Sequence, residues 1–398
     1  MARTKRIRTV ATATACTGVL LASAACGAGG SDSDTIVIGM SGPLTGGAAA
    51  YGTNIQSGLQ LAIDDLNEQG VTVDGQEYQV ELRSLDDHYA PDVAATNAQR
   101  LAEQDDAAVI FVPHAGGIQA SQELNSTRTE FLLGAYSSDP KIVAQGNELT
   151  MMIPPNFESY IEPFVDQLKV DGVERLGLLG TSSEYGQEWT RLLSEEWSSR
   201  GGEVLSNNSI DYAEVSDFAG PVSRTLAQDP DVIFLGGPSQ PTALIVEEAR
   251  NQGYEGSFLF MDQPKFEEME VFTDPENLND AIGVKPAEHY DEPGTEHVVN
   301  RWDTEITDER PLTTEVSLNY QAMTLVVKAM EIAGSIDDPH AIRGALEEAL
   351  GEVDDSFHVT GFPDEITDAG HLLNTELEVA YRTPEGEYEY LPIDQVDE

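Results

Sequence analysis

Short runs of apolar, β-branched residues alternate along this chain with longer segments in which apolar residues recur every three or four positions. The first run is 35–40, and the helical segment that follows it ends at Gly70. Buried parallel strands have the first composition, and the 3.6-residue period indicates amphipathic helices. This pattern predicts strands at 35–40, 78–82, 107–112 and 131–133. It also predicts one helix that ends at Gly70 and two more over 91–104 and 118–130.

The same alternation begins again after Pro154 and Pro155. It predicts strands at 175–179, 204–210, 232–235 and 257–260, with helices over 157–168, 185–200, 221–228 and 242–251. Two further helices, at 314–333 and 339–350, and a closing hairpin over 377–390 complete the chain. Strands that alternate with helices form a parallel sheet covered on both faces. We therefore predict an α/β fold with two Rossmann-like, doubly wound lobes.

The charge of the chain excludes several kinds of partner. It has 71 Asp and Glu residues against 21 Lys and Arg residues, a formal net charge of −50. Such a field repels the phosphates of nucleic acids and the surface of an anionic membrane. Since 40% of the residues are apolar and recur regularly, the chain can still bury a core. An acidic excess of this size is typical of a protein that stays hydrated in high salt.

The first residues resemble an export signal. Arg3, Lys5, Arg6 and Arg8 precede a short apolar stretch, and small residues lead to Cys26. We expect a signal peptide over 1–25, a lipidated Cys26 and a flexible tether over 26–34, which makes the protein extracytoplasmic and anchored to the cell membrane only by lipid. The alternative is an ordinary signal peptide with an incidental cysteine. Cleavage would leave 17 basic and 71 acidic residues, a formal charge of −54.

Residues that suit a small ligand follow the predicted strands. In open α/β sheets, ligands bind outside the carboxyl ends of the strands. His114, Ala115, Gly116 and Gly117 precede a predicted helix, whose free N–H groups suit an anion. Tyr51 and Tyr185 suit the walls of a small pocket. The hydroxyls of Ser137 and Ser138 suit its interior, and Tyr136, which precedes them, is a further candidate.

At these loops the chain resembles the type I periplasmic solute-binding proteins of ABC transporters, in particular the branched-chain amino-acid-binding (Leu/Ile/Val-binding) group. The resemblance extends over about residues 34–390 and rests on the order and spacing of four motifs: IVIGMSGPLTG…YG at 36–52, DDHYAPDVA at 86–94, EYGQE at 184–188 and FLGGPSQPTALIVEEARNQG at 234–253. It implies two lobes joined by three crossovers, which close around a ligand by hinge motion.

The resemblance also implies roles for individual residues. Tyr51 matches the family's aromatic residue in the first loop, and Tyr185 matches a tyrosine that covers the ligand. Ser138 matches a threonine that contacts the ligand, and near Asp262 the family has an acid that pairs with the ammonium group. Ser239 stands where an aromatic residue is common.

One departure from the family pattern affects the ligand. Gly116 and Gly117 stand where family members have serines that hold the ligand α-carboxylate. His114 is a candidate replacement for the lost anion-binding hydroxyls, and a structural loop histidine is the alternative. The loss weakens the case for a standard α-amino acid.

These observations predict a monomeric, non-enzymatic substrate-binding protein of an ABC importer, which takes a branched-chain amino acid or a related small polar solute and no cofactor. Its partners are that solute and an ABC permease complex. The predicted lobes are residues 35–153 with 285–372, and residues 154–284 with 373–398.

Two alternatives remain at this point: a ligand-sensing ectodomain that acts through a separate signalling partner, and a secreted hydrolase. Asp86, Asp87 and His88 are metal ligands by type, but their spacing matches no compact zinc motif. The chain has no G-x-S-x-G nucleophile elbow and no phosphate-binding glycine motif, which disfavours hydrolase and nucleotide chemistry.

Overall fold

The computed structural model describes residues 34–398, with the exception of 171, 213, 307–309, 375–376 and 394–398. The predicted signal peptide and the predicted lipidation site at Cys26 lie outside the described residues. Within the described part of the chain, no helix is both long and apolar enough to cross a membrane.

The first sheet is doubly wound, as the alternation of strands and helices predicts. Its strand order is β2-β3-β1-β4-β5-β6, and β1, β3, β4, β5 and β6 run parallel. Only β2 is antiparallel, because a two-residue turn joins it to β3. The bounds are β1 Thr35–Gly42, β2 Val71–Val73, β3 Gln76–Asp86, β4 Val109–Val112, β5 Leu132–Ala135 and β6 Thr150–Met152.

The second sheet repeats this architecture. Its order is β15-β14-β11-β10-β9-β7-β8. Five strands are parallel, and the β14–β15 hairpin is added antiparallel at the β11 edge. The bounds are β7 Arg175–Leu178, β8 Glu203–Asn207, β9 Val232–Leu235, β10 Ser257–Phe260, β11 Ala281–Val284, β14 Glu378–Arg382 and β15 Tyr388–Pro392.

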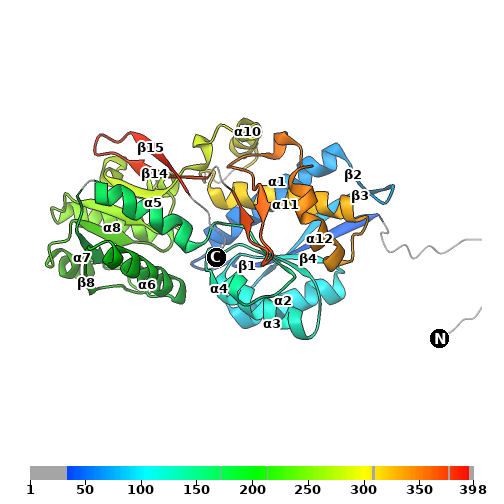
Figure 1. Ribbon diagram of the computed structural model, residues 1–398, viewed down its shortest axis with the longest axis horizontal. Coiled ribbons are helices and arrows are strands. Elements are labelled where there is room, and N and C mark those ends of the chain that lie inside the picture. The colour runs from blue at the N-terminus through cyan, green and yellow to red at the C-terminus, as the bar shows by residue number, and fades with distance from the viewer. Residues whose placement is uncertain (1–33, 171, 213, 307–309, 375–376, 394–398) are drawn as a thin grey trace, which may run out of the picture. The chain divides into compact units, whose positions relative to one another are not determined.

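Helices cover both faces of each sheet (Figure 1). The first sheet has one apolar cluster with α1, α11 and α12 and another with α2 and α3, and the second has one with α5 and α6 and another with α7 and α8. The helices are α1 Ala49–Gln69, α2 Pro91–Gln104, α3 Ala115–Thr127, α4 Lys141–Ala144, α5 Phe157–Val170, α6 Glu184–Ser199, α7 Ala219–Leu226, α8 Ser239–Asn251, α9 Phe266–Met269, α10 Thr295–Glu305, α11 Thr314–Ala333 and α12 Pro339–Leu350. Three short 3₁₀ turns lie at Pro275–Leu278, Ala287–His289 and Asp355–Phe357.

The chain passes three times between the elements of the two sheets: after β6, after β11 and after the small β12–β13 ladder (Glu365–Ile366 and Leu372–Leu373). After the second passage, α10 lies beside α1. There His297 Nε2 lies 3.1 Å from the Asp65 carboxylate, and Arg301 forms a short ion pair with the same carboxylate. The predicted α/β fold with two doubly wound halves and three crossovers is therefore confirmed.

Close packing explains the glycine in the middle of α1. A Cβ atom at Gly58 would lie 2.2 Å from the backbone oxygen of Val316 in α11. Because only glycine allows this approach, α11 lies directly against α1, beside it in Figure 1. This contact places the start of α11 against the first half of α1, which matters for the site.

Candidate functional site

A cavity of about 190 Å³ lies where strands of both sheets end. The loops that line it follow β1, β3, β4 and β5 of the first sheet and β7 and β10 of the second, and α11 adds one residue. In the first sheet this place is next to the point where the strand order reverses, which is the usual ligand position in doubly wound sheets. Its lining residues are Tyr51, Tyr89, Pro91, Pro113, His114, Ala115, Gly116, Tyr136, Ser137, Ser138, Ser183, Glu184, Tyr185, Asp262, Gln263, Lys265 and Glu315.

His114 is the N-cap of α3 and uses both of its ring nitrogens. Nδ1 accepts a hydrogen bond from the Gly117 N–H at 3.0 Å, and Nε2 lies 3.1 Å from the Asp87 carboxylate. Asp87 also accepts a bond from the Ser41 hydroxyl at 3.0 Å. The acceptor role of Nδ1 assigns the proton of the neutral ring to Nε2. His114 therefore holds the helix start, and its nitrogens are already paired.

The glycines at the start of α3 also have a packing reason. A Cβ atom at Gly117 would lie 2.5 Å from the His114 ring, and one at Gly116 would lie 2.8 Å from Pro91. The serine hydroxyls expected from the family pattern are thus replaced by a capping histidine. The N–H groups of Ala115 and Gly116 remain in the first turn, where a helix favours an anion.

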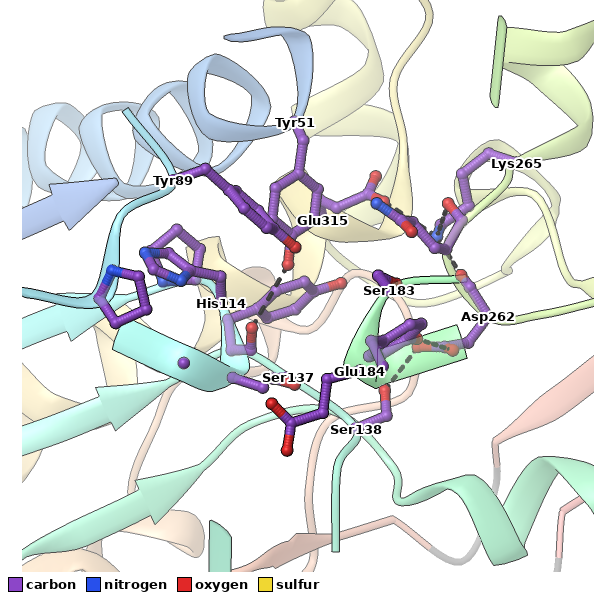
Figure 2. A pocket seen from close by; sticks show the side chains of 17 residues that line it. Tyr51, Tyr89, His114, Ser137, Ser138, Ser183, Glu184, Asp262, Lys265 and Glu315 are labelled. Atoms are coloured by element: carbon purple, nitrogen blue, oxygen red, sulfur yellow. Dashed lines mark hydrogen bonds and ion pairs between the residues drawn. The ribbon is translucent and has the colours of Figure 1, made fainter. Parts of the chain in front are cut away.

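Tyrosine rings form much of the cavity wall (Figure 2). The rings of Tyr51 and Tyr136 lie with centroids 6.2 Å apart, and the Tyr51 hydroxyl donates to the Tyr136 carbonyl at 3.3 Å. Tyr89 stacks on His114 at 4.7 Å. Burial, then the neighbouring Tyr89, and then the acids Glu315 and Asp262 raise the pKa of Tyr51 well above its ordinary value. These phenols are therefore neutral donors at physiological pH.

Asp262, directly after β10, is held by three donors. Its Oδ1 accepts a short hydrogen bond from Tyr185 and one of 2.8 Å from Trp189 Nε1. Its Oδ2 accepts one of 2.5 Å from Ser138, which Figure 2 shows. Ser138 follows β5 of the first sheet, whereas Tyr185 and Trp189 belong to α6. This carboxylate therefore joins elements of both sheets.

A buried ion pair closes another side of the cavity. Lys265 Nζ lies 2.9 Å from Glu315 Oε1, and both residues are only 3% exposed. Burial is the largest single influence on the pKa of Lys265 and lowers it, but the charges of Glu315 and other nearby acids together outweigh burial, so the pKa is raised. Lys265 precedes α9 and Glu315 lies in the first turn of α11. The pair thus joins the two sheet systems a second time.

The structure brings together nine of the eleven residues that the sequence predicted for ligand binding. They line the cavity: Tyr51, His114, Ala115, Gly116, Tyr136, Ser137, Ser138, Tyr185 and Asp262. Gly117 does not line it, and its N–H is already bonded to His114. Ser239 lies in a neighbouring cavity of about 330 Å³, where its hydroxyl donates to Glu268 at 2.5 Å.

Sequence reasoning missed several lining residues. Tyr89, Ser183, Glu184, Gln263 and Lys265 stand in loops that follow predicted strands, so their position was a usable signal. Glu315 carried no such signal, since it begins a helix that the sequence places far from those loops.

Within the described residues, no group of three or more His, Cys, Asp or Glu side chains is placed to hold a metal ion. Asp86, from the acid pair considered above, instead accepts the Leu44 N–H and the His88 N–H at 3.0 Å each. These bonds shape the loops beside the cavity.

Comparison with known sequences gives a consistent result. The sequence model of a family described as periplasmic binding protein matches residues 35–380. An amino acid binding protein of Pseudomonas aeruginosa is 23% identical over 228 residues, which span 56% of this chain and 59% of that relative. The substrate-binding protein BasB of a chemotactic signal transduction system in Halobacterium salinarum is 24% identical over 84% of this chain and 79% of its own.

A solved structure has the same fold. The branched-chain amino acid transporter substrate binding protein LivJ from Streptococcus pneumoniae, in complex with isoleucine, aligns with a TM-score of 0.73. The alignment covers 90% of this chain and 99% of that one, at 20% sequence identity.

Proposed function

Since the chain belongs to the periplasmic binding protein family, we propose that its cavity binds an amino acid, with the branched-chain type first, or a related small polar solute. The observation that carries this proposal is a cavity lined by strand-end loops of both sheets. It offers free helix N–H groups at one side, carboxylates at another and tyrosine rings between them. A zwitterion with an apolar side chain matches that arrangement.

We propose further that the two sheets belong to separate lobes that close around the ligand. The lobes comprise residues 35–153 with 285–372 and residues 154–284 with 373–398. The Ser138–Asp262 and Lys265–Glu315 contacts support this reading, because each joins the two sheet systems beside the cavity. The protein would act only by closing around the ligand, and no covalent bond of the ligand would change.

A thermal-shift screen tests the function. A ligand that binds only the folded state at about 100 times its dissociation constant adds about 2.7 kcal/mol of stability. We expect branched-chain amino acids to raise the melting temperature by several degrees, and other amino acids, amides and small carboxylates to do so less. The Ser137→Phe variant fills the cavity and is the matched control. If no compound of the panel shifts the wild type, or if the control shifts equally, the proposal is wrong.

Delivery of the bound solute to an ABC permease is the first proposal for the step after binding. The similarity to BasB, which is named for chemotactic signal transduction, supports a second: sensing through a separate partner. Deletion of the gene separates the two roles. Loss of amino-acid uptake supports import, and loss of chemotaxis with unchanged uptake supports sensing. Both relatives and LivJ are named as binding proteins, which supports a non-enzymatic role over a hydrolase.

We also propose export and a lipid anchor at Cys26, from the positive and apolar segments that precede it. The Cys26→Ser variant should leave the membrane fraction and appear in the soluble extracytoplasmic fraction. If it still fractionates with membranes, lipidation at Cys26 is wrong.

A further inference from the structure

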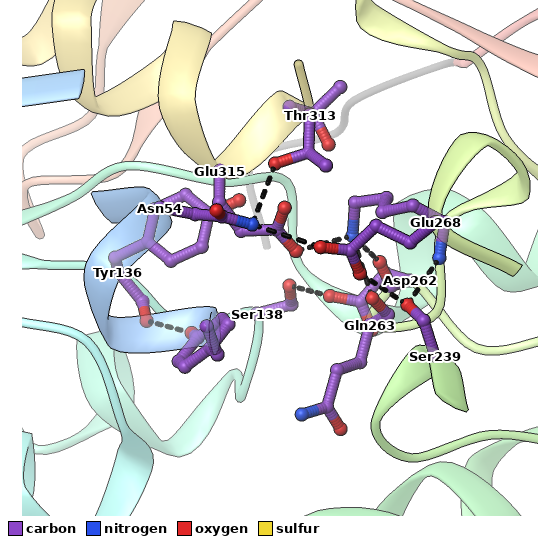
Figure 3. A network of polar contacts seen from close by, with 12 residues as sticks. Asn54, Tyr136, Ser138, Ser239, Asp262, Gln263, Glu268, Thr313 and Glu315 are labelled. Carbon is purple, nitrogen blue, oxygen red and sulfur yellow. Dashed lines mark hydrogen bonds and ion pairs between the residues drawn. The ribbon is translucent and has the colours of Figure 1, made fainter. Parts of the chain in front are cut away.

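Two cavities meet at a wall that contains an unusual set of charges. Tyr51, Gln263 and Glu315 line both the cavity described above and the neighbouring one of about 330 Å³. Around this wall lie three carboxylates, those of Asp262, Glu268 and Glu315 (Figure 3). The ammonium group of Lys265 lies beside them. The hydrogen bonds of these groups decide which of them can serve a ligand.

Asp262 has little capacity left. A carboxylate offers about four acceptor sites, and Tyr185, Trp189 and Ser138 occupy three of them. These donors come from α6 and from the loop after β5. The hydrogen bonds indicate that Asp262 holds the cavity wall in position.

Lys265 has no proton left for a ligand carboxylate. An ammonium group has three donors. Lys265 Nζ gives one to the Asp262 carbonyl by a short bond, one to the Gln263 carbonyl at 3.0 Å and one to Glu315 Oε1 at 2.9 Å. Its charge is thereby committed to the protein.

Glu315 differs from both. Its Oε1 is paired with Lys265, but its Oε2 is buried and accepts no hydrogen bond from any residue in the described part of the chain. Leaving a buried acceptor unpaired costs free energy, and more for a charged group. Burial, and then the charge of Glu315, raises the pKa of Glu268, so these two carboxylates are close enough to repel each other. Three carboxyl groups and one ammonium group thus lie at this wall, a formal excess of negative charge.

We infer that Glu315, and not the family's acid position at Asp262, receives the ammonium group of the ligand. An amine would give Glu315 Oε2 its missing donor and would offset the excess negative charge. The rings of Tyr51 and Tyr136 flank the same cavity, and aromatic faces attract a cation. The inference rests on the proposed function, and it narrows the ligand to solutes with a protonated amine.

Paired ligands test it. Leucine and leucic acid, in which a hydroxyl replaces the ammonium group, are titrated into the wild type, Glu315→Gln and Asp262→Asn, with Trp fluorescence and calorimetry as readouts. A hydrogen bond to a charged group is worth about 1.5–3 kcal/mol, or about 10- to 150-fold in affinity. We expect Glu315→Gln to lower the affinity for leucine by this factor and the affinity for leucic acid far less. Asp262→Asn should lower the affinities for both ligands by similar factors.

The amide of Glu315→Gln can still accept from Lys265, so the variant should fold. Ligand-free melting temperatures check this. If it does not fold, the double variant Lys265→Met with Glu315→Leu, which replaces the buried pair by apolar groups, is read in the same way. The inference is wrong if Glu315→Gln prefers leucine over leucic acid as strongly as the wild type does. It is also wrong if only Asp262→Asn loses this preference. In both cases the proposed binding of an amino acid is unaffected. Failure of the wild type to bind any amino acid overturns the proposed function and this inference together.

Discussion

Glu267, in the short helix α9, shows how one residue links burial to pH. Both of its carboxylate oxygens are buried, and neither accepts a hydrogen bond from another side chain that the structure describes. Burial raises the pKa of Glu267 to about 8. The folded state therefore holds a proton that the unfolded chain, with an ordinary value of 4.5, releases. Because the folded state binds more protons over this range, stability falls as the pH rises from about 4.5 to about 8.

The Glu267→Gln variant should remove this dependence. We expect a gain of about 1–3 kcal/mol in the free energy of unfolding at pH 8, since each pKa unit corresponds to about 1.4 kcal/mol, and little change at pH 4. Urea denaturation across this range measures it. The control is Glu276→Gln, an exposed acid, which removes the same charge. Equal gains in both variants would mean that net charge, and not burial of Glu267, is the cause.

At the scale of an element, α3 depends on a cap that also supports its neighbour. The first N–H groups of a helix lack partners within it. In α3, His114 accepts one of them and contacts Asp87, whereas in α6 the Ser183 hydroxyl accepts the Gly186 N–H at 3.2 Å and serves as a plain cap. Asp87 is fully buried, so its carboxylate needs the donor that His114 supplies. The start of α3 is thus fixed from two sides beside the cavity.

We expect His114→Ala to destabilise the protein by more than Ser183→Ala. Loss of a cap costs about 0.5–2 kcal/mol, and the buried Asp87 would add about 1–3 kcal/mol by losing a donor. His114→Asn keeps a capping oxygen and should recover part of the loss. Chemical denaturation of the three variants gives the comparison. Equal losses in His114→Ala and Ser183→Ala would show that the contact with Asp87 contributes nothing.

Across the whole molecule, a few basic residues serve many acids. Arg200 contacts Glu162, Asp166 and Glu196, and Arg301 contacts Asp64, Asp65 and Glu305. Even with such sharing, 71 acids exceed 21 Lys and Arg residues so far that a formal charge of −50 remains. The mutual repulsion of the excess acids opposes the folded state at low ionic strength.

Salt should therefore stabilise this protein. The screening length falls from about 10 Å at 0.1 M to about 3 Å at 1 M, so we expect the melting temperature to rise by several degrees over this range of KCl. Sucrose at equal water activity is the control, because it leaves charge interactions unscreened. A melting temperature that is constant or falls with KCl would contradict the electrostatic explanation.

Local periodicity in the sequence determined the α/β class and many of the elements. The helices at 91–104, 314–333 and 339–350 and the strands at 232–235 and 257–260 have the predicted bounds, because their apolar patterns are long or sharply bounded. The strands β2, β6 and β11 have three or four residues and were not predicted. Such short segments form through their neighbours in the sheet and leave little periodic signal.

The candidate cavity lies at the strand-end loops that the sequence indicated, since loops after parallel strands gather at one edge of a sheet. Only the tertiary structure decided which polar groups in those loops remain available. Asp262 accepts a hydrogen bond from Ser138, which is 124 positions away in the chain, and Lys265 forms an ion pair with Glu315. Pairings at such separations have no periodic signature, because the packing of α11 against α1 and the approach of the two sheet systems create them.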